Sequence, residues 1–128
     1  SMKHFNYSEF DCKCRTCKKH HLTKGENEMD EDFLQMLDHA RELSGIPFVV
    51  NSGLRCEANN KTAGGKKNSA HLTGCAADIH CTDSRSRCYI IGALLEAGIN
   101  RIGVSPTFIH ADNSYDAEHS EDVIWLYN

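Results

Sequence analysis

The 128-residue sequence lacks a long hydrophobic run, an excess of positive charge, internal repeats and low-complexity tracts. No apolar stretch reaches the roughly 18–20 residues that a membrane-spanning helix needs. The chain has 14 lysines and arginines against 18 aspartates and glutamates, so its formal net charge is −4. This balance argues against a dedicated binder of nucleic acid or of an anionic membrane, because such proteins are basic.

The first residues also lack an apolar segment behind Lys3, so no secretory signal is visible. Ser1, which precedes Met2, is interpreted as a cloning remnant and is left out of the fold reasoning. We therefore expect synthesis in the cytoplasm, or export by a route that the sequence does not carry.

Length and composition predict a single soluble domain over residues 1–128, with a Cys-bearing N-terminal segment (3–24) packed on it. Hydrophobic residues make up 40% and charged residues 25%, which is ordinary for a globular fold. A chain of this size can bury a true core without disulfide staples. We expect Phe5, Tyr7 and Phe10 to anchor the N-terminal segment, and we take a monomer as the default state.

Seven cysteines and eight histidines are the unusual part of the composition. An odd number of cysteines excludes a complete set of internal disulfides. Without a secretory signal the thiols are expected to be reduced, and metal binding then becomes an option.

Apolar spacing predicts two main helices. The first begins at an N-cap on Asp30 and ends at Gly45. The second begins at Asp83 or Ser84 and ends at Gly98. The expected inward positions of the first are Phe33, Met36, Leu37, Ala40 and Leu43. Those of the second are Cys88, Ile91, Leu94 and Leu95.

Short β-like stretches cover residues 47–51, 75–81, 101–104, 108–111 and 123–127. Residues 52–69 are polar and glycine-bearing, and we interpret them as a functional loop with one helical turn near 57–61. Together these elements predict an α+β fold with a small, mostly antiparallel sheet and flanking helices.

The residues with metal-ligating chemistry are His71, Asp78 and His110. Imidazole nitrogen and carboxylate oxygen both bind Zn²⁺ at about 2.0–2.2 Å. Two histidines and one carboxylate leave a fourth position for water, whose pKa zinc lowers from 15.7 to about 7. Taken alone, a His–Asp pair seven residues apart in a histidine-rich chain arises by chance more often than by metal binding. Small residues between the two, Gly74 among them, leave room beside a metal.

Segments 52–55, 69–78 and 108–112 together resemble the zinc D-Ala-D-Ala carboxypeptidases, peptidase family M15. That family includes peptidoglycan L,D-endopeptidases, many of them phage endolysins. Segments 7–10 and 123–127 extend the resemblance to the short branch found in phages, prophages and bacteria. It therefore covers nearly the whole chain. The zinc scaffold is also similar to the hedgehog signalling domain, so the fold alone does not establish an activity.

The resemblance implies one catalytic Zn²⁺ held by His71, Asp78 and His110, and hydrolysis of peptidoglycan stem peptides. It also implies action on the cell wall, after release from the cell or as part of a phage particle. It does not choose a carboxypeptidase over an endopeptidase, because specificity depends on loop shape.

Arg55 matches the arginine of the family's Ser-Gly-x-Arg motif. Its donors suit a substrate carboxylate or the oxyanion on the scissile carbonyl, and the alternative is a salt bridge that pins the loop. Ser69 orients the substrate, braces the ligand loop, or is only a turn residue. A lysine group on the long loop either attracts anionic stem peptides or is simply solvated. It consists of Lys61, Lys66 and Lys67.

The general base is less obvious. Several family members carry an acid three residues before the last ligand, where this chain has Thr107. We predict Asp112 as the substitute, because residues i and i+2 of a strand share a face, so Asp112 would face the site together with His110. The alternative is that Asp112 only orients a ligand. By the same geometry His80 would serve as an acid or oxyanion donor, unless it is a solvated or core histidine.

Cys12, Cys14 and Cys17, with His20 or His21, have the spacing of a second, structural zinc site. Free thiols and a disulfide are the alternatives. The remaining cysteines are predicted to be small buried residues. These are Cys56, Cys75, Cys81 and Cys88.

Three functional hypotheses follow. The first is a zinc peptidase of the cell wall. The second is a zinc-stabilised binding module of the same fold without turnover, which the lack of an acid at Thr107 keeps open. The third is a redox or metal-storage protein built on the cysteines.

Overall fold

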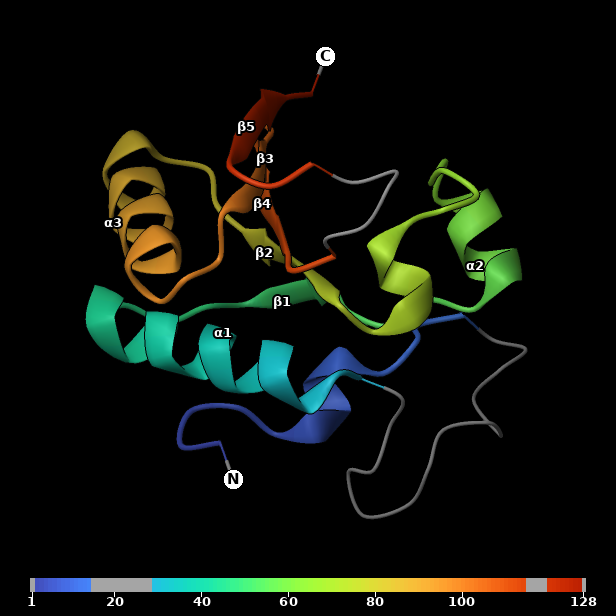
Figure 1. The fold of residues 1–128 in the computed structure, drawn as a ribbon, viewed down its shortest axis with the longest axis horizontal. Helices are drawn as coiled ribbons and strands as arrows, with labels where there is room; N and C mark the ends of the chain where they lie inside the picture. The colour runs from blue at the N-terminus through green and yellow to red at the C-terminus, as the bar shows by residue number, and fades with distance from the viewer. Residues whose placement is uncertain (1, 15–28, 115–119, 128) are drawn as a thin grey trace.

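The computed structural model describes residues 2–14, 29–114 and 120–127, and its centre is a five-stranded sheet. The strands are β1 (Val50–Ser52), β2 (Ala76–His80), β3 (Arg101–Val104), β4 (Phe108–Asp112) and β5 (Val123–Leu126). Their order across the sheet is β1-β2-β4-β3-β5, and only the β3–β5 pairing is parallel (Figure 1). The predicted α+β fold with a mostly antiparallel sheet is therefore confirmed.

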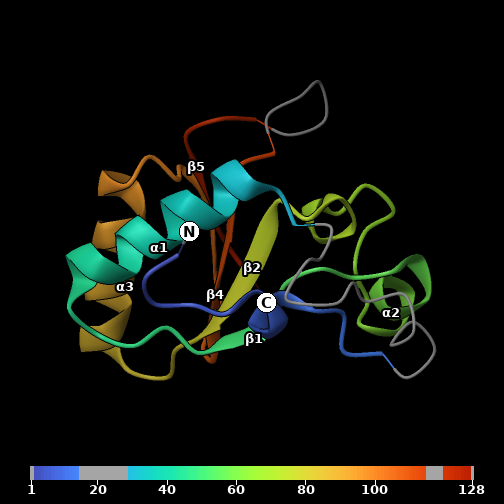
Figure 2. The same cartoon turned by 90° about the horizontal axis from the view of Figure 1, so that it is seen from below.

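Helices flank the sheet on both sides. Figures 1 and 2 place α1 (Glu31–Ser44) and α3 (Ser84–Glu96) to one side of the strands and the short α2 (Glu57–Thr62) to the other. Within the described residues, two 3₁₀ helices, η1 (Tyr7–Phe10) and η4 (Ala70–Thr73), lie in the connecting segments. In the part of the chain that is described, none of the helices combines the length and apolar character needed to traverse a bilayer.

Both long helices begin at the predicted caps. The Asp30 carboxylate accepts a hydrogen bond from the Phe33 backbone N–H at 2.9 Å, and the Asp83 carboxylate accepts one from Ser86 at 2.9 Å. These bonds satisfy N–H groups that have no partner within the helix. At the end of α1, Gly45 adopts a left-handed conformation with φ of 72°, which favours glycine and stops the helix.

The core fills the space between the sheet and the two long helices. Its largest fully buried apolar side chains are Phe10, Phe33, Phe48, Leu34, Leu37, Ile79, Ile90, Leu94, Ile99, Ile102 and Ile109. Leucine and isoleucine from α1 and α3 thus share the core with one isoleucine from each of β2, β3 and β4. Burial of this inner face leaves the opposite face of the sheet available for polar side chains.

The predicted inward faces of the helices are partly wrong. Leu43 is 40% exposed and Leu95 45% exposed, and Cys88 is also exposed. On α3 the predicted Leu94 is buried, but the other buried residues are Ile90 and Ala93, and the predicted Ile91 is half-buried. The helix carries apolar residues on two overlapping stripes, so periodicity could not decide which stripe packs against the sheet.

Residues 3–14, the described part of the N-terminal segment, pack against the rest of the fold. Phe5 and Phe10 are buried, with ring centroids 5.3 Å apart in an edge-on contact, whereas Tyr7 is only half-buried. The buried carboxylate of Asp38 on α1 accepts hydrogen bonds from two backbone N–H groups of the segment, those of Lys3 and His4. These bonds tie the start of the chain to α1.

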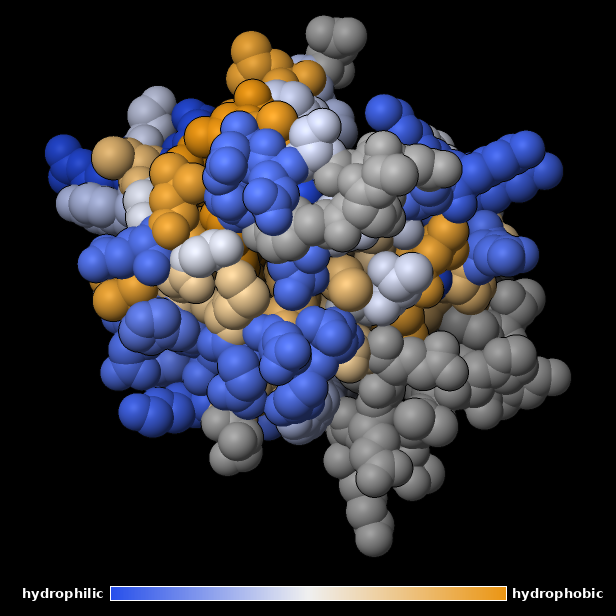
Figure 3. Space-filling view, viewed as in Figure 1, coloured by the Kyte–Doolittle hydropathy of each residue, from blue (hydrophilic) through white to orange (hydrophobic). Residues whose placement is uncertain are grey.

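Strand β5 leaves apolar side chains on the surface. Leu126 is 78% exposed and Ile124 53% exposed. Figure 3 shows hydrophobic residues at the top of this face, where Figure 1 places β5. This strand lies at one end of the strand order, next to the site described below.

The packing of α1 makes a stability prediction. Phe33→Ala should lower the free energy of unfolding by about 3–5 kcal/mol, because it leaves a cavity among fully buried side chains. Leu43→Ala on the same helix is the matched control and should cost less than about 1 kcal/mol. Urea unfolding followed by circular dichroism measures both. Equal losses would contradict the observed face of α1.

Candidate metal centre

His71, Asp78 and His110 come together although they belong to three different elements. His71 lies on η4, Asp78 on β2 and His110 on β4. Antiparallel pairing places Asp78 directly opposite His110. All three residues are buried, and one ligand atom from each lies within 4.8 Å of the others. The structure therefore brings together the ligand set that the sequence predicted.

The ring of His71 is held by backbone. Its Nδ1 lies 2.7 Å from the carbonyl oxygen of Gly53, and a carbonyl can only accept, so the Nδ1–H donates. This leaves Nε2 facing Asp78 Oδ1, 3.3 Å away. Ser69 caps η4, because its Oγ accepts a hydrogen bond from the His71 backbone N–H at 3.2 Å. The side chain of Ser69 therefore braces the loop that carries His71.

The ring of His110 is held at both nitrogens. Nδ1 lies 2.9 Å from Asp78 Oδ1, the same oxygen that faces His71, and Nε2 lies 2.6 Å from Asp112 Oδ2. The two imidazole planes meet edge-on, with centroids 5.2 Å apart. Two nitrogens and one carboxylate oxygen therefore converge at one point.

The convergent atoms fit a zinc ion. Bonds of about 2.0–2.1 Å in a tetrahedron place neighbouring ligand atoms roughly 3.3–3.4 Å apart. The distances from Asp78 Oδ1 to the two imidazole nitrogens, 3.3 and 2.9 Å, are close to this spacing. The donor types, imidazole nitrogen and carboxylate oxygen, are those of catalytic zinc sites.

Charge interactions hold the site in its ionised form. Burial alone would raise the pKa of Asp78, but hydrogen bonds from His110 and His71 outweigh it and the pKa lies below its usual range. Burial would lower the pKa of His110, and its bonds to Asp112 and Asp78 raise it instead. The carboxylate of Asp78 is therefore ionised, as a metal ligand must be.

Arg55 is tied into the site. Its Nη2 lies 3.1 Å from Asp78 Oδ2, its Nε donates to Ser52 Oγ at 3.0 Å, and its Nη1 donates to Asn60 Oδ1 at 3.3 Å. These bonds use three of the five guanidinium donors. Arg55 thus forms the loop-pinning salt bridge that was one of the two alternatives, and it also lines the cavity of the site.

Asp112 is buried and surrounded by donors. Its Oδ2 faces His110 Nε2, and its Oδ1 accepts from Arg101 Nε at 2.6 Å and from the Ser114 backbone N–H at 3.1 Å. Burial raises its pKa, but the bonds from His110 and Arg101 bring the pKa below its usual value. Asp112 does share a face with His110, and its contacts favour the alternative in which it orients a ligand.

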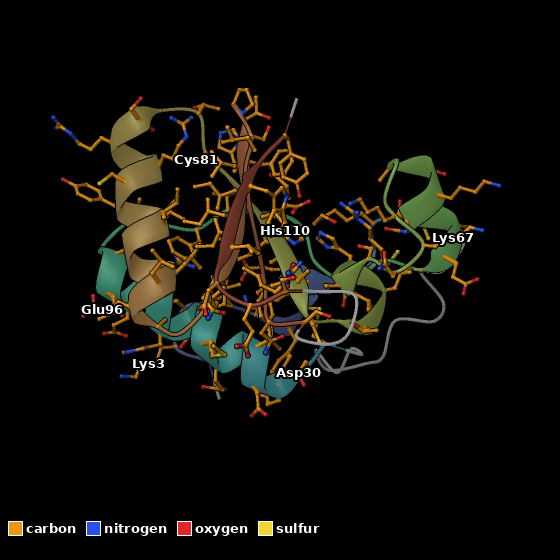
Figure 4. All side chains as sticks on the ribbon, turned by 45° about the horizontal axis from the view of Figure 1, so that its top comes forward. Lys3, Asp30, Lys67, Cys81, Glu96 and His110 are labelled. Atoms are coloured by element: carbon orange, nitrogen blue, oxygen red, sulfur yellow. The ribbon has the colours of Figure 1, made fainter. Side chains whose placement is uncertain are left out.

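An open cavity of about 860 Å³ lies beside the three ligands. One wall is aromatic: the Trp125 ring lies 5.5 Å from His110, and Tyr127 packs 5.2 Å from Phe108. The Arg101 guanidinium stacks over Trp125 at 5.2 Å. The opposite wall comes from η4 and the loop after α2, at residues 63–66 and 68–71. Figure 4 shows His110 on the side of the sheet that faces this loop.

Some predicted residues lie elsewhere. His80 is exposed at the end of β2, and neither it nor Thr107 lines the cavity. Among the three lysines, only Lys66 lines it, and Figure 4 shows Lys67 at the outer edge of the α2 region. The solvated alternative for His80 therefore agrees with its position.

The cysteines that were predicted to be small buried residues differ in their exposure. Cys81 is buried as expected, whereas Cys88 is exposed because it lies on the outer face of α3. Cys56 is half-buried and gathers with Cys12 and Cys14 into one cluster. Burial raises the pKa of the half-buried Cys75 thiol. The other predicted ligands of a second zinc, Cys17 and His20 or His21, lie outside the described residues.

Sequence reasoning missed Gly53, Arg101 and Trp125 as parts of the site. Gly53 must be glycine, because a Cβ there would lie 2.8 Å from the backbone of Phe10. An arginine in a β-like stretch of mostly apolar residues signals a buried charge that needs an acid, but the identity of that acid depends on strand register. Trp125 had no local signal beyond its place in the last strand.

Two histidines and an acid that converge beside an open cavity have the composition of a catalytic metal site. The family model for Peptidase M15 matches residues 3–112 of the chain. The protein therefore belongs to the Peptidase M15 family, a family of zinc-dependent metallopeptidases. No curated protein matches the chain.

The Arg101–Asp112 pair makes a second stability prediction. Arg101→Met should cost about 3–5 kcal/mol of folding free energy, because it leaves the buried carboxylate of Asp112 without its cation. The double variant Arg101→Met with Asp112→Asn should recover part of this loss, since it also removes the carboxylate charge that Arg101→Met leaves unpaired. Urea unfolding of the single and double variants measures the coupling. If the loss of folding free energy in the double variant equalled the sum of the losses in the two single variants, Arg101 and Asp112 would not be coupled.

Proposed function

We propose that the protein is a zinc-dependent peptidase that hydrolyses peptidoglycan stem peptides, as a D-Ala-D-Ala carboxypeptidase or an L,D-endopeptidase. The observation that carries the proposal is the convergence of His71 Nε2, Asp78 Oδ1 and His110 Nδ1 beside an open cavity. Membership of the Peptidase M15 family supports the same reaction class.

His71, Asp78 and His110 would hold the metal. When bound, Zn²⁺ polarises the scissile carbonyl and lowers the pKa of a water molecule in its open position. The protein's own contribution is to fix the three ligand atoms before substrate arrives. The Gly53 carbonyl and the Asp112 carboxylate do this for the two imidazoles, each by accepting the N–H on the side away from the shared oxygen.

We assign Asp112 as the positioning residue for His110 rather than as the proton acceptor. Both of its oxygens already accept hydrogen bonds, from His110 on one and from Arg101 and Ser114 on the other. A carboxylate held in this way has a lowered pKa and is a weak base.

Arg55 and the cavity walls would bind the substrate. The two guanidinium donors of Arg55 that its three bonds do not use suit a carboxylate or the developing oxyanion of an acyl-transfer step. Lys66 adds positive charge for the carboxylates of a stem peptide, and Trp125 supplies an apolar wall. Ser69 braces the ligand loop beside them.

The proposed substrate fixes the place of action. Stem peptides belong to the cell wall, so we propose that the protein works there as a monomer, after release from the cell or as part of a phage particle. This location follows from the substrate alone.

A non-catalytic, zinc-stabilised binding module remains the second candidate. One observation favours it: within residues 2–14, 29–114 and 120–127, the carboxylates that line the cavity are those of Asp78 and Asp112, and both are engaged in hydrogen bonds. A binding module would hold muropeptides and leave them intact.

Digestion of a purified muropeptide, analysed by mass spectrometry, tests the activity. The zinc-loaded protein should release a defined fragment, whose mass also identifies the bond that is cut. His71→Ala should abolish both zinc binding at this site and hydrolysis, because it removes a ligand. His80→Ala, the change of an exposed histidine at the end of β2, is the control and should retain both. A bound but uncut muropeptide would establish the binding module instead.

Asp112→Ala tests the positioning role. Loss of the carboxylate that orients His110 should weaken zinc affinity at this site by about 10–100-fold. Excess zinc should then restore a large part of kcat. If Asp112 were the general base, zinc affinity would be unchanged and added zinc would restore nothing. Metal titration and kcat at saturating zinc therefore separate the two roles.

A further inference from the structure

The cysteine cluster at the start of the chain is a second site with metal-ligating chemistry. We propose that Cys12, Cys14 and Cys56 bind a second metal ion, a thiophilic divalent cation such as Zn²⁺, in a structural site. The cluster shares no residue with the His71, Asp78 and His110 centre. The assignment of this site therefore stands independently of the proposed peptidase activity.

The sulfur spacing fits thiolate coordination. Cys14 Sγ and Cys56 Sγ lie 3.5 Å apart, and one sulfur from each of the three cysteines lies within 4.8 Å of the others. A tetrahedral zinc with Zn–S bonds of about 2.3 Å places its sulfurs roughly 3.8 Å apart. The three sulfurs are thus arranged near one face of a ligand tetrahedron.

Hydrogen-bond donors point at the sulfurs. The Cys56 backbone N–H donates to Cys12 Sγ at 3.4 Å, and the Asn59 side-chain amide donates to the same sulfur at 3.5 Å. The Asn59 backbone N–H donates to Cys56 Sγ at 3.4 Å. A neutral thiol is a weak acceptor, whereas a metal-bound thiolate carries charge that such donors stabilise. The buried sulfur of Cys12 therefore has two donors in the positions that outer-shell donors of a metal-bound sulfur occupy.

The position of the cluster indicates what the metal would do. Cys12 and Cys14 follow η1, whereas Cys56 comes directly after Arg55. Next to the cluster, the Leu54 N–H already donates to the Phe10 carbonyl at 2.8 Å. A metal held by all three cysteines would clamp the N-terminal segment to the loop that carries Arg55. An effect of this clamp on substrate binding rests on the proposed function, but the metal site itself does not.

Metal content of purified variants tests the site. The zinc-loaded wild type should hold two zinc ions per chain. Cys56→Ser should hold only the ion at the His71, Asp78 and His110 centre. His71→Ala should hold only the ion at the cysteine cluster. Cys88→Ser, the change of an exposed cysteine outside the cluster, should retain two. The proposal would be overturned if Cys56→Ser retained two zinc ions. It would also be overturned if the wild type held a single zinc ion that was lost in His71→Ala and kept in Cys56→Ser.

Cobalt substitution distinguishes the ligand chemistry of the two sites. Co²⁺-loaded His71→Ala should keep the thiolate-to-cobalt charge-transfer band in the near ultraviolet, and Co²⁺-loaded Cys56→Ser should lose it. Absence of the band from His71→Ala would refute thiolate binding. The cobalt experiment also tests the cysteine site separately from the proposed peptidase activity. The charge-transfer band should persist even if the His71, Asp78 and His110 centre binds no metal.

Alkylation of the wild type covers the case in which Cys56→Ser does not fold. With zinc bound, Cys12, Cys14 and Cys56 should resist iodoacetamide and become reactive after a strong chelator is added. Cys88 should react in both conditions. Labelling of the three cysteines in the zinc-loaded protein, or a disulfide between Cys14 and Cys56 found by non-reducing peptide mapping, would refute the site.

Discussion

The pairing of β2 with β4 is the constraint on which the site depends. Its register places Asp78 opposite His110 on one face and Ile79 opposite Ile109 on the other. The two isoleucines are fully buried in the core, so burial of apolar surface fixes which residues of both strands face the cavity. A slip of one residue would exchange the faces and bury the two ligands in the apolar core. Hydrophobic packing on one side of the sheet therefore sets the positions of the candidate ligand residues Asp78 and His110 on the other.

Charge balance explains how so many polar groups can be buried in one place. Each of the two carboxylates is shared between an imidazole and an arginine: Asp78 with His110 and Arg55, and Asp112 with His110 and Arg101. An unpaired buried carboxylate would be costly, whereas these have partners on both oxygens. The same bonds fix the orientation of His110 and leave its Nδ1 toward the shared oxygen of Asp78. Stability and preorganisation of the ligands thus come from one network.

Local sequence patterns predicted more of the fold than of the hydrogen-bond network at the candidate metal centre. The caps at Asp30 and Asp83 depend on residues within one turn, and the strands on short apolar stretches, so both could be found from the sequence. The ligand set could be named from residue chemistry together with family resemblance. The pairing of Arg101 with Asp112 could not, because it depends on the register of β3 against β4. The place of Cys56 in the cysteine cluster could not be predicted for a similar reason, because Cys56 lies 42 residues from Cys14 in the chain. Long-range contacts have no periodic signature.

The segment from Gly53 to Cys56 bonds to residues of both candidate metal sites and to the N-terminal segment. The carbonyl of Gly53 holds His71, the N–H of Leu54 bonds to Phe10, the side chain of Arg55 holds Asp78, and the N–H of Cys56 bonds to Cys12. The N–H of Arg55 adds a bond to the His71 carbonyl at 3.0 Å. Because a Cβ on Gly53 would collide with the Phe10 backbone, the N-terminal segment lies as close as a glycine permits. Consecutive residues with partners in different elements leave the loop little freedom to move alone. Any displacement of the N-terminal segment would therefore reach the metal ligands through the backbone itself.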